Sequence, residues 1–272
     1  MNVNEFLDDL RDRVDGELVN PVEIEEAAVF PDQFYVERRT WKRIRDVVAV
    51  VADLKGSTNF SYNRRPEATA RIYEAATGNM ARTIERFEPD FVDIQGDGLF
   101  GLFHGHRRYQ RAMCAAITLK SFGIQALEAA LDDHFGVDAP DTGIKVGMAS
   151  GTIIVKNVGV RGTNEPVWAG RPVNYATKCA QAADKQELII TPQVWEHFAD
   201  NHWVAYSCGC SEENTTPSEL WDPITVEKLP EGAADCRRLR TGIAWCSTHG
   251  DQFCQAILDG LRLRKSVVAA AA

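Results

Sequence analysis

Two aspartates in this sequence each follow an apolar run beside glycine, a setting in which carboxylates can hold a metal ion. Asp53 ends the run VVAVVA and precedes LKGST, and Asp97 lies inside the turn of FVDIQGDGLFGLF. Each run is typical of a buried strand, so each carboxylate is expected at an edge of a sheet. Two carboxylates brought together repel each other unless a cation lies between them. The pair therefore predicts a Mg²⁺ or Mn²⁺ site, because these ions take oxygen ligands and substrate phosphates.

The residues that follow Asp53 are small and polar and lead towards a helix. Successive backbone N–H groups in Leu54 to Thr58 could cradle a triphosphate. A single aspartate beside glycine is better explained as a turn residue, in either position. Both aspartates together with a phosphate-binding type of loop favour two-metal phosphoryl or nucleotidyl transfer.

The elements that must position these residues alternate between helices and strands, with hairpins between them. The pattern predicts a strand over 47–54, a helix over 66–86, a hairpin over 91–103, a helix over 109–130, a strand pair over 144–150 and 152–158 broken at Gly151, a helix over 173–183 and a strand over 188–191. This order favours an α+β domain with a mainly antiparallel sheet and packed helices. We divide the chain into a helical lead-in (1–45), a catalytic domain (46–198) and a C-terminal extension (199–272) in which the periodicity is lost.

Composition narrows the class of protein. The chain has 272 residues, 44% of them hydrophobic and 25% charged, with a formal net charge of −9. An acidic surface argues against general nucleic-acid binding, which requires a basic field. The N-terminus lacks an apolar leader, and the longest apolar run, 47–52, is too short to cross a bilayer. We therefore expect a cytoplasmic protein with reduced thiols and no membrane or nucleic-acid partner.

Four segments, in this order, resemble the motifs of class III nucleotide cyclases: ADLKGST, IQGDGLFGLF, GIKVGMASG and WAGRPVNYATKCA. The resemblance implies a ferredoxin-like α+β catalytic fold that forms a head-to-tail homodimer. It also implies two Mg²⁺ or Mn²⁺ ions per active site, and active sites at the dimer interface. One subunit then supplies the metal-binding aspartates and the other the residues that stabilise the transition state.

The resemblance assigns roles to matching positions. Asp53 and Asp97 match the metal ligands, and the Leu54 carbonyl matches a further metal contact. Gly56, Ser57 and Thr58 form the expected phosphate-binding turn.

The later helix carries the second half of the expected site. Asn174 matches the asparagine that orients the ribose. The position of the transition-state arginine holds Lys178, which keeps the positive charge but lacks the planar bidentate fork. We expect Lys178 to act as a point charge on phosphate, with Arg171 as the alternative.

The expected base pocket departs from the purine pattern. Asp93 stands where adenylate cyclases have lysine and guanylate cyclases have glutamate, and Val167 stands where a second adenine-reading residue is expected. A carboxylate accepts hydrogen bonds, so Asp93 could accept from uracil N3–H or cytosine N4–H₂. Trp168 could stack on a base, although packing in a core or interface is the commoner role of an aromatic residue.

These features resemble the bacterial pyrimidine cyclases of the Pycsar anti-phage systems. That resemblance implies a UTP or CTP substrate, with UTP favoured, and a cyclic nucleotide product that activates an effector. An adenylate or guanylate cyclase with unusual base contacts is the alternative with the same chemistry. A catalytically inactive nucleotide-binding module, suggested by Lys178, and a metal-dependent phosphohydrolase are the alternatives of other classes.

The cysteines gather near the C-terminus. The group consists of Cys208, Cys210, Cys236, Cys246, His249 and Cys254. Their C-x-C, C-x₂-H and C-x₇-C spacings match no standard zinc template, so buried free thiols with a histidine in a small helical cap are favoured over zinc. Cys114 and Cys179 fall on helix patterns and are expected in the core.

Overall fold

The computed structural model describes residues 2–30, 39–60, 65–160, 163–210 and 216–270. It divides into two compact units. One unit holds Met1–Arg45 and Ile153–Ala169, and the other holds Asp46–Thr152 and Gly170–Ala272. The larger unit carries the two aspartate motifs.

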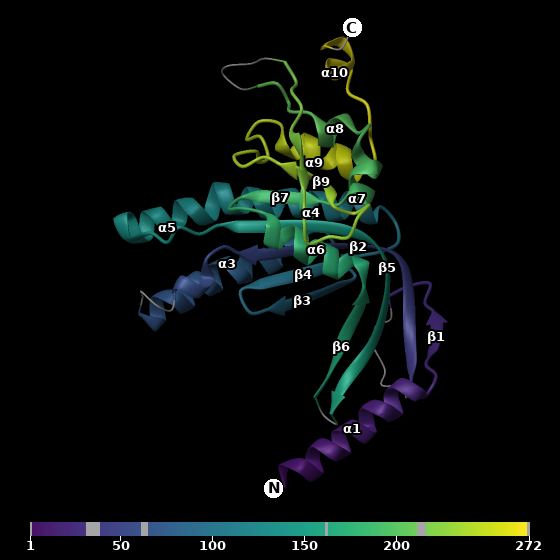
Figure 1. The fold of residues 1–272 in the computed structure, drawn as a ribbon. Coiled ribbons are helices and arrows are strands. Elements are labelled where there is room, and N and C mark those ends of the chain that lie inside the picture. Colours follow the sequence, from purple (N-terminus) through teal and green to yellow (C-terminus); the bar gives the residue numbers. More distant parts are fainter. Residues whose placement is uncertain (1, 31–38, 61–64, 161–162, 211–215, 271–272) are drawn as a thin grey trace. The chain divides into compact units, whose positions relative to one another are not determined.

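One nine-stranded sheet organises the described residues (Figure 1). Its strand order is β3-β4-β2-β5-β7-β9-β8, with β1 paired to β2 and β6 paired to β5. The strands are β1 (Glu23–Glu26), β2 (Thr40–Leu54), β3 (Phe91–Gln95), β4 (Gly98–Phe103), β5 (Ile144–Val160), β6 (Thr163–Gly170), β7 (Glu187–Ile190), β8 (Trp221–Thr225) and β9 (Asp235–Leu239). The β1–β2 and β5–β7 pairs are parallel, and the other pairs whose register is known are antiparallel.

Helices of three kinds accompany the sheet. The α-helices are α1 (Val3–Val19), α3 (Pro66–Glu85), α4 (Arg108–Phe122), α5 (Glu128–Phe135), α6 (Arg171–Ala182), α7 (Pro192–Phe198), α8 (His202–Ala205), α9 (Gly250–Leu258) and α10 (Lys265–Ala270). Two short 3₁₀ turns, Ser57–Asn59 and Gly136–Asp138, and a π turn at Gly123–Leu127 complete them. The expected α+β fold is confirmed, and so is the helix expected over 66–86.

The two faces of the sheet carry different helices. In β2 the alternate residues Val48, Val50 and Ala52 join the core beneath α3 and α4. Gly101 of β4 lies directly under α3, since a Cβ atom there would come 2.4 Å from the Ile84 Cδ1 atom. Because side chains alternate along a strand, the odd-numbered residues at the end of β2 point to the opposite face.

Helix α6 packs on that opposite face, and one glycine makes its approach possible. A Cβ atom on Gly147 of β5 would lie 2.0 Å from the Ala176 carbonyl oxygen and 2.5 Å from the Ala180 nitrogen. Both atoms belong to the backbone of α6 and cannot turn away. The central glycine of GIKVGMASG, Gly147, is therefore explained by close helix–strand packing.

We expect Gly147→Ala to lower the free energy of unfolding by about 1–3 kcal/mol, because the added methyl group has no space beside α6. Chemical denaturation measures the change. The control is Gly78→Ala on α3, where an added Cβ meets nothing within 4 Å. Since alanine favours helix over glycine, that variant should be about 0.5–1 kcal/mol more stable than the native chain. Equal stability of the two variants would contradict the packing argument.

Two sequence expectations before residue 160 need correction. The helical lead-in ends at Val19, and strands follow at Glu23–Glu26 and from Thr40, so residues 40–45 are extended. The expected break at Gly151 is also wrong. Gly151 has φ of 154°, a value open to glycine, and β5 runs on through it to Val160, where β6 is its hairpin partner.

The C-terminal segment keeps more regular structure than its sequence pattern predicts. Strand β9 pairs antiparallel with β7 and with β8, so this segment extends the same sheet. Expected loss of regular structure after Asp200 is therefore wrong. The signal was hidden because β8 and β9 are short and carry Pro, Asp and Arg residues. The expected core positions of Cys114 and Cys179 are confirmed, since neither is exposed.

One helical run among the described residues, Arg108–Asp138, has the length and hydropathy of a membrane span. Of its most apolar window, 56% is buried inside the protein. The central helix of a folded domain has the same properties, so the run is weak evidence for a membrane segment.

Candidate active site

The end of β2 and the β3–β4 turn lie side by side. The register pairs Ala52 with Leu99, so Asp53 falls opposite Gly98. A Cβ atom on Gly98 would lie 2.8 Å from the Ala52 carbonyl oxygen and 3.4 Å from Asp53 Oδ1. Asp97 immediately precedes this glycine. The structure thus brings both predicted metal-binding aspartates to the same end of two adjacent strands.

Asp53 has a cationic neighbour that the sequence analysis missed. The Lys145 Nζ atom lies 3.1 Å from Asp53 Oδ2, and the lysine side chain is only 16% exposed. Lys145 stands between the buried residues Ile144 and Val146 of β5, so it points away from the core and towards the face that carries Asp53. A charged residue within the apolar run IKVGM was the available signal.

The donor atoms at this end of the sheet suit a hard divalent cation. Asp53 and Asp97 offer carboxylate oxygens, and Leu54, whose side chain is buried in the core, offers its backbone carbonyl. Mg²⁺ and Mn²⁺ prefer oxygen ligands of this kind.

A cavity of about 160 Å³ opens beside Asp53. Residues from β2, from the β3–β4 hairpin and from α6 form its wall. Besides Asp53, its polar side chains are Gln95, Thr177 and Gln181. The sequence analysis missed these three, although Gln95 follows Asp93 by two residues and must share its face of the strand.

The turn after Asp53 is held by hydrogen bonds to the start of β5. The Lys55 nitrogen donates to the Gly143 carbonyl at 2.9 Å, and the Thr142 hydroxyl donates to the Lys55 carbonyl at 2.7 Å. Gly56 has φ of 70°, in the left-handed region that glycine tolerates, and Ser57 begins a 3₁₀ turn. The predicted phosphate-binding residues thus form a fixed, compact turn directly after the metal-binding aspartate.

Helix α6 presents two faces. Its buried face consists of Pro172, Ala176, Cys179 and Ala180. Asn174 and Arg171 are exposed and Lys178 is half-buried, and the three recur at helical spacing on one side. Asn174 Nδ2 donates to the Gly170 carbonyl at 2.9 Å, and Lys178 Nζ lies 5.8 Å from the centre of the Tyr175 ring.

These three predicted residues are not among those that line the cavity beside Asp53. On α6 the cavity is lined by Val173, Thr177, Ala180 and Gln181. Asn174 is turned by about 100° from Val173 around the helix axis but by only about 20° from Gln181. The predicted ribose and transition-state residues therefore lie next to the cavity wall without forming part of it.

The predicted base-binding residues fall into two groups. Asp93 is half-buried on β3, where Gln95 Nε2 donates to its Oδ2 atom at 3.0 Å. Val167 and Trp168 lie on β6 in the smaller unit. Val167 is 43% exposed, and the Trp168 ring centre lies 6.0 Å from that of Phe30. Trp168 therefore has an aromatic packing partner within its own unit, and base stacking stays a prediction.

Comparison with known proteins relates these features to a family. The family model described as "Adenylate and Guanylate cyclase catalytic domain" matches residues 40–213. A protein of Micromonospora echinofusca named "Uridylate cyclase" is 46% identical over 85% of this chain and 75% of its own length. A second protein of that name, from Propioniciclava tarda, is 43% identical over 83% of this chain and 72% of its own length.

A solved structure resembles the fold at low sequence identity. The adenylyl cyclase CyaB from P. aeruginosa aligns with a TM-score of 0.59 at 16% identity, over 75% of this chain and 97% of that one. At this identity the likeness concerns the fold alone. The α+β architecture with a mostly antiparallel sheet is thus common to both.

Proposed function

This chain belongs to the adenylate and guanylate cyclase catalytic domain family, the class III nucleotide cyclases, and we propose that it is a uridylate cyclase. In this reaction the 3′-hydroxyl of UTP attacks the α-phosphorus, and 3′,5′-cyclic UMP and pyrophosphate are formed. The observation that carries the choice of UTP is the 46% and 43% identity to two proteins named uridylate cyclase over most of the chain. The carboxylate of Asp93 supports a pyrimidine over adenine, but it does not separate uracil from cytosine.

We propose that Asp53, Asp97 and the Leu54 carbonyl hold the divalent ions, two per active site. Bound there, such ions lower the pKa of the 3′-hydroxyl and neutralise charge on the phosphates. The protein's own part is to keep these oxygens at one end of two adjacent strands. Lys145 holds the Asp53 side chain in place, because its ammonium lies 3.1 Å from the carboxylate.

The remaining groups position the nucleotide. Backbone N–H groups at Gly56, Ser57 and Thr58 are proposed to receive the phosphates of UTP. Asn174 orients the ribose, and Lys178 offers positive charge to the phosphate in the transition state, with Arg171 as the alternative. Since these α6 residues do not line the Asp53 cavity of their own chain, we propose that they complete the site of a second subunit in a homodimer.

Asp93 is the proposed reader of the base. Its carboxylate accepts a hydrogen bond from Gln95, which fixes its orientation while leaving acceptor capacity for uracil N3–H. Val167 and Trp168 on β6 are also proposed as base-binding residues. Adenine N1 is an acceptor, so a carboxylate at this position offers it no donor.

We expect Asp93→Asn to lower kcat/KM for UTP by about 10–100-fold, since a hydrogen bond to a charged group is worth about 1.5–3 kcal/mol. The loss should appear with UTP and should not appear with ATP, which gains nothing from the carboxylate. Initial rates with each nucleotide measure both. An unchanged preference for UTP in this variant would show that Asp93 does not bind the base.

Product analysis tests the proposed function itself. Purified protein is incubated with Mn²⁺ and each nucleoside triphosphate separately, and the products are separated by chromatography. Cyclic UMP as the main product supports the proposal, whereas cyclic CMP alone, or cyclic AMP or cyclic GMP alone, would replace the substrate. Linear mono- or diphosphate would indicate a phosphohydrolase, and absence of turnover with every nucleotide would indicate a nucleotide-binding module.

We propose that the protein acts in the cytoplasm as a second-messenger synthase in anti-phage defence. The resemblance to Pycsar cyclases supports this role, in which the cyclic nucleotide acts on a separate effector. The acidic net charge of −9 supports a small-molecule substrate over a nucleic-acid partner.

A further inference from the structure

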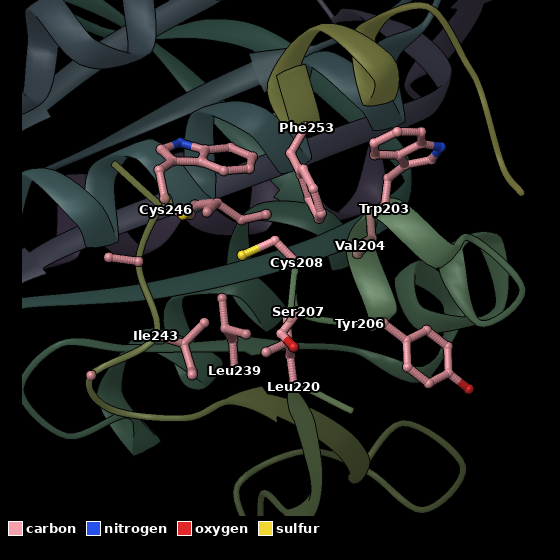
Figure 2. A pocket seen from close by; sticks show the side chains of 14 residues that line it. Trp203, Val204, Tyr206, Ser207, Cys208, Leu220, Leu239, Ile243, Cys246 and Phe253 are labelled. Atoms are coloured by element: carbon pink, nitrogen blue, oxygen red, sulfur yellow. The ribbon is translucent and has the colours of Figure 1, made fainter. Parts of the chain in front are cut away.

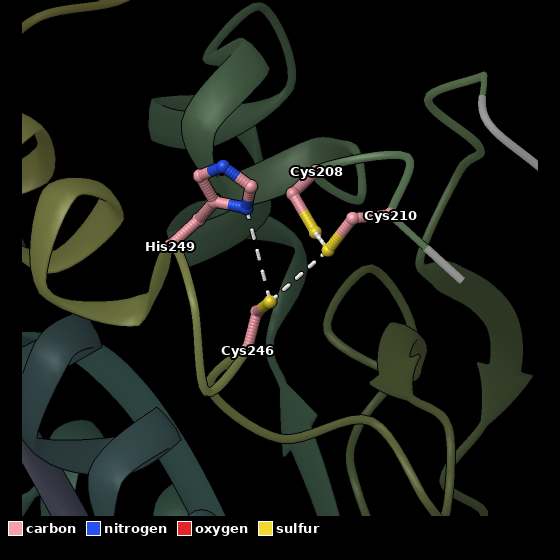
Figure 3. A group of neighbouring side chains, drawn as sticks. All are labelled: Cys208, Cys210, Cys246 and His249. Atoms are coloured by element: carbon pink, nitrogen blue, oxygen red, sulfur yellow. Dashed lines mark hydrogen bonds between the residues drawn. The ribbon is translucent and has the colours of Figure 1, made fainter. Parts of the chain in front are cut away.

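Four potential metal ligands converge in the C-terminal part of the larger unit. Cys208 and Cys210 come from the segment after α8, and Cys246 and His249 come from the segment before α9 (Figure 3). Their three sulfur atoms and one imidazole nitrogen all lie within 4.8 Å of one another. The two pairs are far apart in the sequence, so only the fold brings them together.

The ligand atoms lie close enough together to share one small ion. The Cys208 and Cys210 sulfurs are 2.9 Å apart, the Cys210 and Cys246 sulfurs are 3.2 Å apart, and Cys246 Sγ lies 3.9 Å from His249 Nδ1. Four ligands around a tetrahedral Zn²⁺ with bonds of about 2.3 Å stand about 3.8 Å apart. Small outward shifts of the sulfurs are therefore enough to admit the ion.

The donor set selects the kind of metal. Three thiols and an imidazole are soft or intermediate ligands, and the cluster holds no carboxylate. Hard ions such as Mg²⁺, which the proposed active site uses, bind poorly to sulfur. A Cys₃His set with four protein ligands is that of a structural zinc site, which has no open position for a substrate.

Three of the other four cysteines have a different setting, and the fourth, Cys254, is half-buried. Cys114, Cys179 and Cys236 are fully buried among apolar residues, as small hydrophobic side chains would be. Cys208 and Cys246 are half-buried, and Cys210 is exposed. Apolar packing does not explain why three thiols and an imidazole meet near the surface, so the expectation of buried free thiols is wrong for these three cysteines.

Each pair of ligands stands on a segment that is already fixed. Trp245, next to Cys246, donates from its backbone nitrogen to Ser121 Oγ at 2.9 Å and from Nε1 to Thr118 Oγ1 at 2.8 Å, which ties this segment to α4. On the other side, Arg264 donates to the Ser207 carbonyl at 2.9 Å. Both segments are thus positioned before any metal binds, which lowers the entropy cost of binding.

An apolar cavity of about 170 Å³ lies beside the cluster, and Cys208 and Cys246 form part of its wall (Figure 2). Trp203 and Phe253 line the same cavity. Bonds from a shared metal ion to both cysteine segments would join the two sides of this wall. Because α9 already packs on the core helix α4, these bonds would also fasten the segment around Cys208 to α4.

We propose that Cys208, Cys210, Cys246 and His249 bind one structural Zn²⁺ ion that fastens the C-terminal segment to the catalytic unit. Each thiol releases its proton on binding, and the three thiolates and the neutral imidazole complete the coordination shell. A disulfide between any two of the cysteines would leave the third thiol and the histidine without a role. The zinc site is independent of the nucleotide that the enzyme converts.

Metal analysis of the whole 272-residue chain tests the proposed zinc site directly. We expect about one zinc ion per chain by inductively coupled plasma mass spectrometry, after growth with zinc and passage over a chelating resin. Cobalt substitution should give the intense visible bands of tetrahedral Co²⁺ together with sulfur-to-cobalt charge transfer. These two measurements need no variant, so they do not depend on the folding of a mutant chain.

Variants identify the ligands. Removal of one ligand by Cys246→Ser should weaken zinc binding by at least about 10–100-fold. The control is Cys254→Ser on α9, which lies outside the cluster and should keep the zinc. Added chelator should lower the Tm of the native chain and of the control, but not that of Cys246→Ser.

Three results would overturn the proposal. One is a zinc-loaded preparation that loses its metal on the resin and shows no cobalt spectrum. Another is equal zinc content in Cys246→Ser and in the native chain. The third is a disulfide among Cys208, Cys210 and Cys246, shown by fewer than seven free thiols per denatured chain in freshly purified protein.

Discussion

Replacing Asp53 by asparagine is expected to lower the rate of cyclic UMP formation by on the order of 10³-fold or more. The amide keeps the size of the carboxylate but loses the negative charge that holds a divalent ion. It also leaves the Lys145 ammonium, 3.1 Å away in the native chain, without an ionised partner. Initial rates with UTP and saturating Mn²⁺ measure the loss.

The matched control is Asp46→Asn, which makes the same change in the same strand. Asp46 is 75% exposed, and Arg108 is 3.8 Å away, so little stability depends on it. Its φ of 55° also suits asparagine. Thermal unfolding should show that both variants are folded, with the lower Tm for Asp53→Asn, because Lys145 loses its ionised partner. If Asp53→Asn keeps more than about a tenth of the native rate, Asp53 is not a ligand of the catalytic metal.

The part of this site that follows one continuous segment could be predicted from the sequence. Apolar runs followed by glycine placed Asp53 and Asp97 at the ends of strands, and the register of β2 with β4 confirms that these ends are adjacent. Lys145 and Gln95 escaped notice because their importance depends on which strand lies next to which. The order β4-β2-β5 in the sheet, which no local pattern states, brings Lys145 to Asp53.

A local sequence pattern does not state which strands are neighbours, and this also explains the errors elsewhere in the fold. A glycine in a strand pattern commonly marks a break, but Gly151 lies within a strand that is paired on into β6. The cysteine cluster is a second case in which the fold, and not the sequence spacing, brings the residues together. Zinc templates are written as sequence spacings, and the C-x-C and C-x₂-H pairs become a plausible set only when β8, β9 and the loops around them bring Cys210 within 3.2 Å of Cys246.

The exposed face of α6 leads to the second large effect. The inner face of α6 packs against Gly147, and the side chains of Asn174 and Lys178 do not line the Asp53 cavity of the same chain. We therefore expect these residues to act on a substrate held by another copy of the chain. A symmetric dimer would give two such shared sites.

We therefore expect two inactive chains to restore activity when they are combined. One carries Asp53→Asn, and the other carries Asn174→Ala together with Lys178→Ala. In a mixed dimer, one of the two sites receives the native Asp53 from one chain and the native Asn174 and Lys178 from the other. Random pairing at equal amounts should give about a quarter of the native rate, since about half of the dimers are mixed and each has one intact site.

A rearranged combination of the same changes separates shared sites from sites within one chain. All three substitutions are placed in one chain, which is mixed with the native chain in differently tagged form, and only the mixed dimers are purified. If the sites are shared, each site of this dimer has one defective half, and its rate should fall to the background of the single variants. If each chain carries its own complete site, this dimer keeps about half of the native rate, and the first mixture restores nothing.

The single variants Lys178→Ala and Arg171→Ala then show which positive charge stabilises the transition state. The variant with the larger loss of kcat identifies the residue that contacts the phosphate.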